Sequence, residues 1–131
     1  MRPDLLLRYL RKKQIKDNKK RFEQKNLQFS VDSLYDLNYM GDSNPDHNLD
    51  IHSPQNAAGK LPVLLVIHGG GYTQCEKFIN DAYSKVFAEK GYRVVNMNYS
   101  LQPEADFIEV MREIFAALHW VEANAQKYGF D

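Results

Sequence analysis

The sequence predicts an α/β fold in which an antiparallel pair of strands is followed by a strand–helix–strand–helix unit. Short apolar runs rich in β-forming residues indicate the strands, and two longer segments with apolar residues at helical spacing indicate the helices. Clusters of Gly, Pro, Asn and Asp separate these segments and indicate turns. The order strand, strand, strand, helix, strand, helix therefore places the chain in the α/β class.

Length and composition are those of one modest globular domain with a basic extension. The chain has 131 residues, of which 44% are hydrophobic and 12% aromatic. Residues 1–25 hold ten Lys or Arg against three Asp or Glu, whereas the rest of the chain holds seven against fourteen. We therefore divide the chain into a basic amino-terminal helix over residues 1–26 and an α/β domain over residues 27–131.

We expect neither a signal peptide nor a transmembrane segment. Leu5, Leu6 and Leu7 run directly into Arg8, so the apolar stretch is too short for either. Cys75 is the only cysteine, which excludes an intrachain disulfide and favours a reducing, cytoplasmic compartment. Because no cluster of Cys and His residues has the spacing of zinc ligands, no metal site is expected.

Residues 4–25 are expected to form an exposed helix with a thin apolar stripe. Basic residues surround its few apolar side chains, which are Leu6, Leu7, Leu10, Ile15 and Phe22. Such a helix could bind nucleic acid or a membrane surface, or it could be a solvated leader that docks loosely on the body of the protein. We favour the docked leader and expect no nucleic-acid partner.

Two strands, over residues 27–40 and 49–53, are expected to form the antiparallel pair. Both are rich in β-forming residues, and a dense turn cluster, GDSNPDHN, lies between them. A third strand, Val63–Ile67, is continuously apolar, as in strands covered on both faces, and is therefore expected to be central. Residues 92–99, YRVVNMNY, are expected to form a fourth, buried strand.

One helix is expected after the third strand and one after the fourth. Apolar residues recur at helical spacing over residues 78–87, and Thr73 and Glu76 have the spacing of a capping box at the start of this helix. A longer helix over residues 104–128 carries a broad apolar stripe. A glycine ends each helix, Gly91 the first and Gly129 the second.

The segment VIHGGGY, residues 66–72, places three adjacent glycines directly after the third strand. Three adjacent glycines cost conformational entropy on folding and contribute no side-chain packing. We therefore infer that the backbone of this segment has a role of its own. A dinucleotide fingerprint would need a glycine at Gln74, and a Walker loop would need Gly-Lys-Ser/Thr where Glu76, Lys77 and Phe78 stand, so neither phosphate motif fits. An oxyanion hole formed by successive N–H groups remains, beside a purely steric turn.

Three segments of the sequence occur together, in this order, in one known family. HGGGY at residues 68–72 resembles an HGGG oxyanion motif, and NYSLQPE at residues 98–104 is similar to the segment N-Y-R-L-A-P-E. ALHWVEANAQKYGFD at residues 117–131 resembles the helix that precedes the nucleophile strand. The resemblance covers about residues 49–131 and is to the α/β-hydrolase esterases and lipases akin to hormone-sensitive lipase and the carboxylesterases. It implies the amino-terminal half of an α/β-hydrolase sheet.

The resemblance also implies roles for the glycine segment. The backbone N–H groups of Gly70 and Gly71 would form the oxyanion hole, while His68 and Gly69 would support the loop. The substrate would be a small-molecule ester, and no metal or organic cofactor is implied. Ser100 stands where the family has an arginine, which puts a local ion pair in doubt. The basic amino-terminal helix is a candidate for part of a lid, as in some similar esterases.

The 131 residues lack the other parts of a serine hydrolase. They contain no G-x-S-x-G nucleophile motif, and the family places its acid and histidine later in the chain. Cys75, near a predicted helix start, could have a lowered thiol pKa and use His47, His52 or His119 as a base, but nothing in the sequence aims an imidazole at it. We therefore expect ordinary core or surface positions for these four residues.

The strand order 1-2-4-3-5 of this fold implies an unpaired edge. Val63–Ile67 would lie between the strand at residues 92–99 and a fifth strand that these residues do not contain, so its outer edge would be apolar and unpaired. We therefore predict that the 131 residues alone are unstable, associate, or are cut from a longer hydrolase chain whose remainder is their partner.

Two functions of different classes follow from these observations. The first is a carboxylic-ester hydrolase of the serine type, of which this chain carries the oxyanion-hole half but not the nucleophile, acid or base. The alternative is a non-catalytic ligand-binding or interaction module on a truncated α/β-hydrolase scaffold. A peptidase or amidase on the same fold is a third possibility, which these residues do not distinguish from an esterase.

Overall fold

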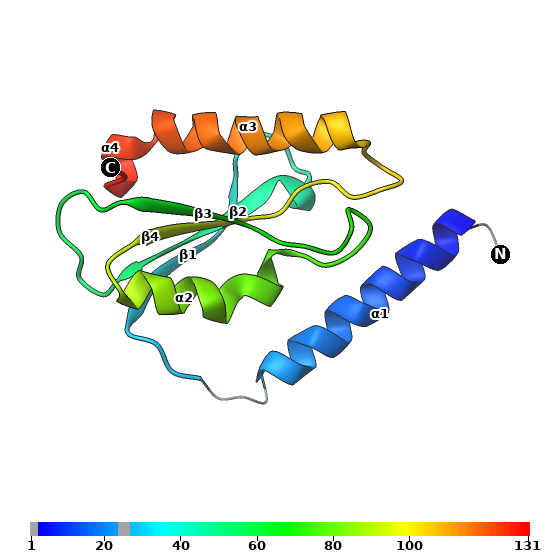
Figure 1. Ribbon diagram of the computed structural model, residues 1–131, viewed down its shortest axis with the longest axis horizontal. Helices are drawn as coiled ribbons and strands as arrows, with labels where there is room; N and C mark the ends of the chain where they lie inside the picture. The colour runs from blue at the N-terminus through cyan, green and yellow to red at the C-terminus, as the bar shows by residue number, and fades with distance from the viewer. Residues whose placement is uncertain (1–2, 24–26) are drawn as a thin grey trace.

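The computed structural model describes residues 3–23 and 27–131, in which a sheet is covered by helices on both faces (Figure 1). Helix α2 (Asp81–Glu89) lies on one face of the sheet, while α3 (Phe107–Ala123) and α4 (Ala125–Tyr128) lie on the other. This layered arrangement confirms the predicted α/β class.

The sheet has four strands, which occupy the predicted places in the sequence. They are β1 (Val31–Asn38), β2 (Asn48–Pro54), β3 (Val63–Ile67) and β4 (Arg93–Met97), in the spatial order β1-β2-β4-β3. Strand β2 is antiparallel to both β1 and β4, whereas β3 and β4 run parallel. The antiparallel pair and the order 1-2-4-3 are thus confirmed, and the carboxyl ends of β3 and β4 meet at one end of the sheet.

The position of β3 agrees with the predicted strand order. The apolar run indicated a strand that is central in the whole fold, with an unpaired outer edge within these residues, and β3 is an edge strand of this four-stranded sheet. Val66 is buried, whereas 42% of Ile67 is exposed. An apolar run indicates a strand that is packed inside a sheet. Within residues 27–131, β3 has a partner strand along one of its two hydrogen-bonding edges only.

The start of the first body helix also differs from the prediction. A short 3-10 helix, η2 (Lys77–Asn80), precedes α2, and the N-cap Asn80 makes no side-chain capping bond. The predicted capping box at Thr73 and Glu76 is therefore wrong. Thr73 Oγ1 instead donates to the carbonyl oxygen of Gly70 at 3.3 Å, because this segment is a turn and not a helix start.

The long carboxyl-terminal helix is interrupted once. Helix α3 begins after Asp106, whose side chain accepts a hydrogen bond from Glu109 N at 2.8 Å, and ends at Asn124. The Asn124 side chain donates to Trp120 O at 2.8 Å and so competes for a helical carbonyl group. The short α4 follows, and Gly129 ends it with the left-handed φ of 68° that favours glycine.

The two faces of the sheet are packed differently. On the α3 face, alternate residues of β2 and β4 form the apolar core with residues of α3, and this core includes Leu49, Ile51, Val95, Met97, Val110 and Ala117. On the α2 face, the intervening residues Asp50, His52 and Asn96 are polar and fully or almost fully buried. Lys77 of η2 compensates Asp50 directly, since the Nζ and Oδ1 atoms are 2.7 Å apart.

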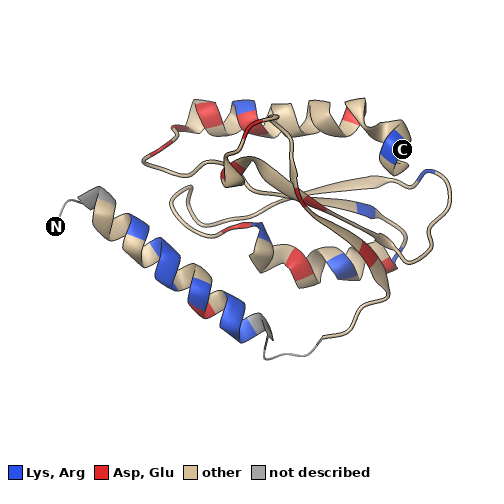
Figure 2. Cartoon of the chain, turned by 180° about the vertical axis from the view of Figure 1, so that it is seen from behind, with Lys and Arg blue, Asp and Glu red and all other residues tan. Residues whose placement is uncertain are grey.

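Helix α1 (Pro3–Glu23) lies where the basic helix was predicted, while residues 1–2 and 24–26 of that prediction lie outside the described residues. Figure 2 shows Lys and Arg positions, coloured blue, along its length. Leu6, Leu7 and Leu10 are exposed, as expected for a helix with a thin apolar stripe. No helix in the described part of the chain is both long enough and apolar enough to span a membrane.

Candidate active site

The three glycines form a sharp turn at the carboxyl end of β3. We call residues 68–73 the glycine loop. Gly70 and Gly71 have φ angles of 124° and 60°, and Tyr72 continues the left-handed path with a φ of 60°. The turn closes through a hydrogen bond of 3.2 Å from Thr73 N to Gly70 O. Successive residues with positive φ are how a main chain brings neighbouring N–H groups toward one point.

The N–H groups of Gly70 and Gly71 donate no hydrogen bond to any described residue. Most amides of a folded chain find a partner, and an amide left without one is expected where a ligand or water accepts the bond. Both amides therefore remain available for an acceptor outside the sheet. Free N–H groups are one requirement of an oxyanion hole.

The three glycines differ in how much space surrounds them. A Cβ atom at Gly70 would collide with the carbonyl group of Gln74 and approach Cys75 Sγ to 3.2 Å. A Cβ atom at Gly71 would meet nothing within 4 Å, although its φ is unfavourable for other residues, and Gly69 has neither restriction. Gly70 is thus the position where only glycine fits both the backbone and the space.

His68 is hydrogen-bonded to the glycine loop and stacks on Tyr99. Its Nδ1 atom lies 2.8 Å from Gly69 O and carries the proton, because a carbonyl oxygen can only accept. The ring stacks on Tyr99 at 4.4 Å between centroids, and the Tyr99 hydroxyl donates to His68 O at 2.8 Å. Burial lowers the pKa of His68, although the Gly69 bond opposes that shift, so the imidazole stays neutral. These contacts are consistent with loop support and place no proton-transfer group at the turn.

The loop between β4 and α3, residues 98–106, packs against the glycine loop. Gln102 N donates to Tyr72 O at 2.7 Å, and Lys77 N donates to the Asn98 side chain at 2.6 Å. The rings of Tyr72 and Phe107 meet edge to face at 5.8 Å. Two of the segments that resemble the esterase motifs are therefore neighbours in space.

Ser100 lies in a buried polar network where the sequence left an ion pair in doubt. Its backbone N–H donates to Glu113 Oε2 at 2.6 Å. The other oxygen, Glu113 Oε1, is 3.1 Å from His47 Nε2, and His47 Nδ1 is 2.7 Å from Asp42 Oδ2. Burial alone would lower the pKa of His47, but its bonds to Asp42 and Glu113 outweigh burial and raise it. Both ring nitrogens of His47 thus face carboxylate oxygens at this site.

The pairing of His47 with Glu113 was not predicted from the sequence. The two residues are 66 positions apart, and no local pattern connects them. The only indication in the sequence was a missing charge, because Ser100 stands where the resembling segment has an arginine. Without that arginine, the buried Glu113 needs another hydrogen-bond donor or cation.

Cys75 and the other histidines occupy structural or surface positions, as predicted. His52 is fully buried, with Nδ1 2.8 Å from Ser33 Oγ, while His119 lies on the exposed side of α3 beside Glu122. Burial raises the pKa of Cys75, which has a positive φ and directly precedes Glu76, the N-cap of the short 3-10 helix η2. The lowered thiol pKa considered from the sequence is therefore wrong.

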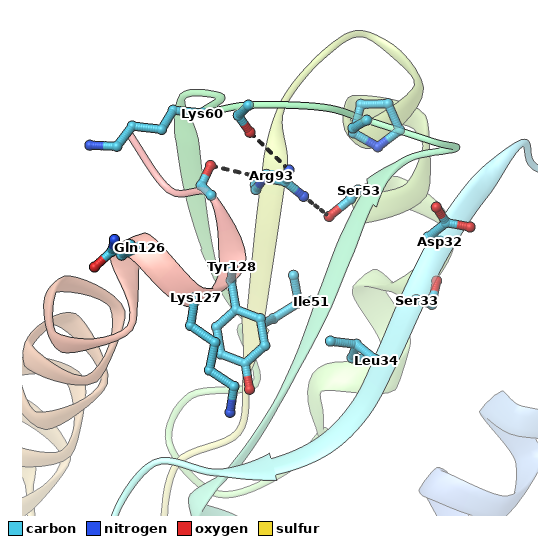
Figure 3. A pocket seen from close by; sticks show the side chains of 14 residues that line it. Asp32, Ser33, Leu34, Ile51, Ser53, Lys60, Arg93, Gln126, Lys127 and Tyr128 are labelled. Atoms are coloured by element: carbon cyan, nitrogen blue, oxygen red, sulfur yellow. Dashed lines mark hydrogen bonds between the residues drawn. The ribbon is translucent and has the colours of Figure 1, made fainter.

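A cavity of about 610 Å³ lies at the opposite end of the sheet, near Ser53 and Tyr128 (Figure 3). Arg93 extends along it and donates three hydrogen bonds, to Gly129 O at 2.9 Å, to Ser53 Oγ at 2.8 Å and to Gly59 O at 3.1 Å. Because its acceptors lie on β2 and on two loops, Arg93 joins these three segments at this end of the sheet. The predicted site residues all lie at the other end.

Comparison with known proteins agrees with the arrangement of these segments. The BD-FAE family matches residues 49–131. The chain belongs to the BD-FAE family. Hormone-sensitive lipase of Bos taurus is 34% identical over 77 residues, which are 58% of this chain and 10% of the lipase. Carboxylesterase NlhH of Mycobacterium tuberculosis is 30% identical over 82 residues, which are 62% of this chain and 26% of that enzyme.

A solved structure extends this likeness to nearly the whole chain. Esterase B from Lactobacillus rhamnosis superposes with a TM-score of 0.86 at 25% identity and covers 97% of this chain and 41% of the esterase. This member of the BD-FAE family therefore has the fold of the amino-terminal part of an α/β-hydrolase esterase or lipase. It spans less than half the length of each of these three relatives.

Proposed function

We propose that the complete protein hydrolyses carboxylic esters with a serine nucleophile and that Gly70 and Gly71 form its oxyanion hole. The observation that carries this proposal is the pair of adjacent N–H groups, both without a partner among the described residues, at the carboxyl end of β3. Kinship with esterases and lipases supports the reaction class. The substrate would be a small-molecule ester.

The proposed chemistry divides the work between two parts of the protein. A serine hydroxyl from the chain beyond residue 131 would attack the ester carbonyl, because residues 1–131 contain no G-x-S-x-G motif. The carbonyl oxygen would become an oxyanion that accepts hydrogen bonds from Gly70 N and Gly71 N. The alcohol would leave, and water would then release the acyl group. His68 would hold the loop without exchanging a proton.

The test is to extend the gene reading downstream and to assay the complete product. We expect a G-x-S-x-G motif within a few tens of residues, and we expect the purified protein to hydrolyse p-nitrophenyl butyrate and to be inactivated by an alkyl phosphonate. The isolated 131 residues should show no turnover. A folded complete product that binds esters without hydrolysing them would contradict the proposal and leave a non-catalytic binding module. Hydrolysis of anilides at a rate similar to that of esters would point to an amidase instead.

A further inference from the structure

One arginine of the exposed helix α1 is partly buried against the body of the protein. The side chain of Arg11 is 15% exposed, whereas those of Arg8 and Lys19 on the same helix are 54% and 52% exposed. An arginine gives up hydration only where acceptors replace it. The acceptors of Arg11 therefore show what α1 is fastened to.

Arg11 connects the glycine loop to the loop between β4 and α3. Its Nε atom donates to Thr73 O at 3.1 Å, and its Nη2 atom donates to Gln102 O at 2.6 Å. Nη2 is also 3.6 Å from Glu104 Oε2. These acceptors lie 62 and more residues away along the chain, and the rigid guanidinium group holds them in one fixed geometry.

Thr73 and Gln102, whose carbonyl groups bind Arg11, are themselves hydrogen-bonded to residues of the proposed oxyanion hole. Thr73 N and Thr73 Oγ1 both donate to Gly70 O. Gln102 N donates to Tyr72 O at 2.7 Å. Gly70 and Tyr72 flank Gly71 on its two sides, so a movement of Thr73 or Gln102 would change the direction of the two free N–H groups.

We propose that Arg11 is a positioning residue that fixes the direction of the Gly70 and Gly71 amides; the proposal rests on the proposed function. Without Arg11, Thr73 O and Gln102 O lose their side-chain donor, and the two loops are joined only by their direct hydrogen bonds, such as that from Gln102 N to Tyr72 O. Arg11 touches no predicted oxyanion donor itself. Its effect is therefore on the stabilisation of the transition state and not on the binding of the ester.

The experiment compares Arg11→Ala with Arg8→Ala in the complete gene product. Arg8 is the matched control, because it lies on the same helix and pairs with the same Glu104 side chain, at 3.0 Å, without a hydrogen bond to a backbone carbonyl of either loop. We expect Arg11→Ala to lower kcat by about tenfold to a hundredfold on p-nitrophenyl butyrate, with KM unchanged. Arg8→Ala should stay within about twofold of the wild type, since it removes only an exposed ion pair.

Binding of a trifluoromethyl ketone separates positioning from a general loss of structure. The ketone forms an oxyanion on the nucleophile, so its inhibition constant should rise by the same factor by which kcat falls in Arg11→Ala. Arg11→Lys, which keeps the charge but loses the planar group, should recover only part of kcat. The proposal is overturned if Arg11→Ala matches Arg8→Ala in kcat, or if kcat falls while the ketone inhibition constant does not change.

A failure of the proposed function would look different. If the wild-type complete product does not hydrolyse esters, the esterase assignment fails whatever the variants do. Hydrogen exchange at the Gly70 and Gly71 amides then still tests Arg11. Faster exchange in Arg11→Ala than in Arg8→Ala supports a positioning role, and equal exchange contradicts it.

Discussion

The two ends of the sheet differ in whether their polar groups are paired. At the end where β2 terminates and β3 and β4 begin, Arg93 donates three hydrogen bonds, and backbone bonds join Leu61 to Gly129 and Asp131 to Leu61. At the other end, the chain leaves β3 through Gly70 and Gly71, whose amides have no partner in the described part of the protein.

Each end contains a glycine that no other residue can replace without strain. At Gly129, a Cβ atom would approach Gly59 O to 2.7 Å and Arg93 Nη2 to 2.9 Å, in a residue with a φ of 68°. At Gly70, it would collide with Gln74 O in a residue with a φ of 124°. The steric problem is the same, but only the second turn presents free N–H groups. The comparison separates a glycine kept for packing from one kept for chemistry.

The largest expected effect is that of Gly70→Ala in the complete protein. The substitution moves the turn and removes one oxyanion donor from its position, so kcat should fall by about a hundredfold to a thousandfold. Gly129→Ala is the matched control, and it should lower the melting temperature while the folded enzyme keeps its kcat. Steady-state kinetics and thermal melts measure both, and an equal loss of kcat in the two variants would show that the ends do not differ.

Arg93→Ala should have the next largest effect, and on stability alone. It removes the Arg93 donors of Ser53 Oγ and Gly59 O and leaves Gly129 O with the Leu61 N–H alone, which should cost about 1–3 kcal/mol of unfolding free energy. Urea denaturation measures the loss, and kcat at low urea should not change. A drop in kcat without a shift in the urea midpoint would contradict the assignment of this end to structure.

A smaller effect is expected from pH, through two buried histidines with opposite shifts. The pKa of His47 is raised by Asp42 and Glu113 against the effect of burial, so its contribution to stability is complete below about pH 6.5 and is lost as the pH rises through the higher, folded-state pKa. Burial lowers the pKa of His52 to about 4, with Lys85 and Lys77 adding to burial and Asp81 opposing it. The contribution of His52 is lost as the pH falls from about 6.5 to about 4.

Two variants check these signs. His47→Gln should flatten the decline of the melting temperature above pH 6.5, and His52→Gln should flatten the decline below it. Melting temperatures of the complete protein between pH 4 and pH 9 provide the measurement. If His47→Gln alters only the acidic side, the ion-pair account of this network is wrong.

The smallest expected effect is that of Cys75→Ala. Burial raises the pKa of Cys75, and no hydrogen bond among the described residues joins it to an imidazole, so it should take no part in the reaction. We expect ester hydrolysis to be unchanged and iodoacetamide to leave the wild-type rate unaffected. A loss of activity on alkylation that Cys75→Ala prevents would give this residue a role that the geometry does not.

The sequence predicted what depends on local pattern. Apolar runs located the four strands, and the order β1-β2-β4-β3 followed from the resemblance to α/β hydrolases. The same resemblance predicted the unpaired outer edge of β3, because the fold places the next neighbour of this strand outside these residues. The local pattern placed a capping box at Thr73, because the spacing of two residues does not reveal the positive φ of Cys75 between them.

The contacts that organise the candidate site could not be predicted in this way. Arg11 reaches Thr73 and Gln102, and His47 reaches Glu113, across 62 to 91 residues of sequence. Such contacts depend on tertiary packing. The role of Gly70 and Gly71 came from the motif and remains a prediction, which the free amides support.

The most direct test of the oxyanion hole is the amide resonances of Gly70 and Gly71 in the complete, ¹⁵N-labelled protein. We predict that addition of an alkyl phosphonate moves both amide protons downfield and slows their exchange with water, while the Gly59 amide at the far end does not change. Unchanged Gly70 and Gly71 resonances in a protein fully modified by the phosphonate would contradict the account.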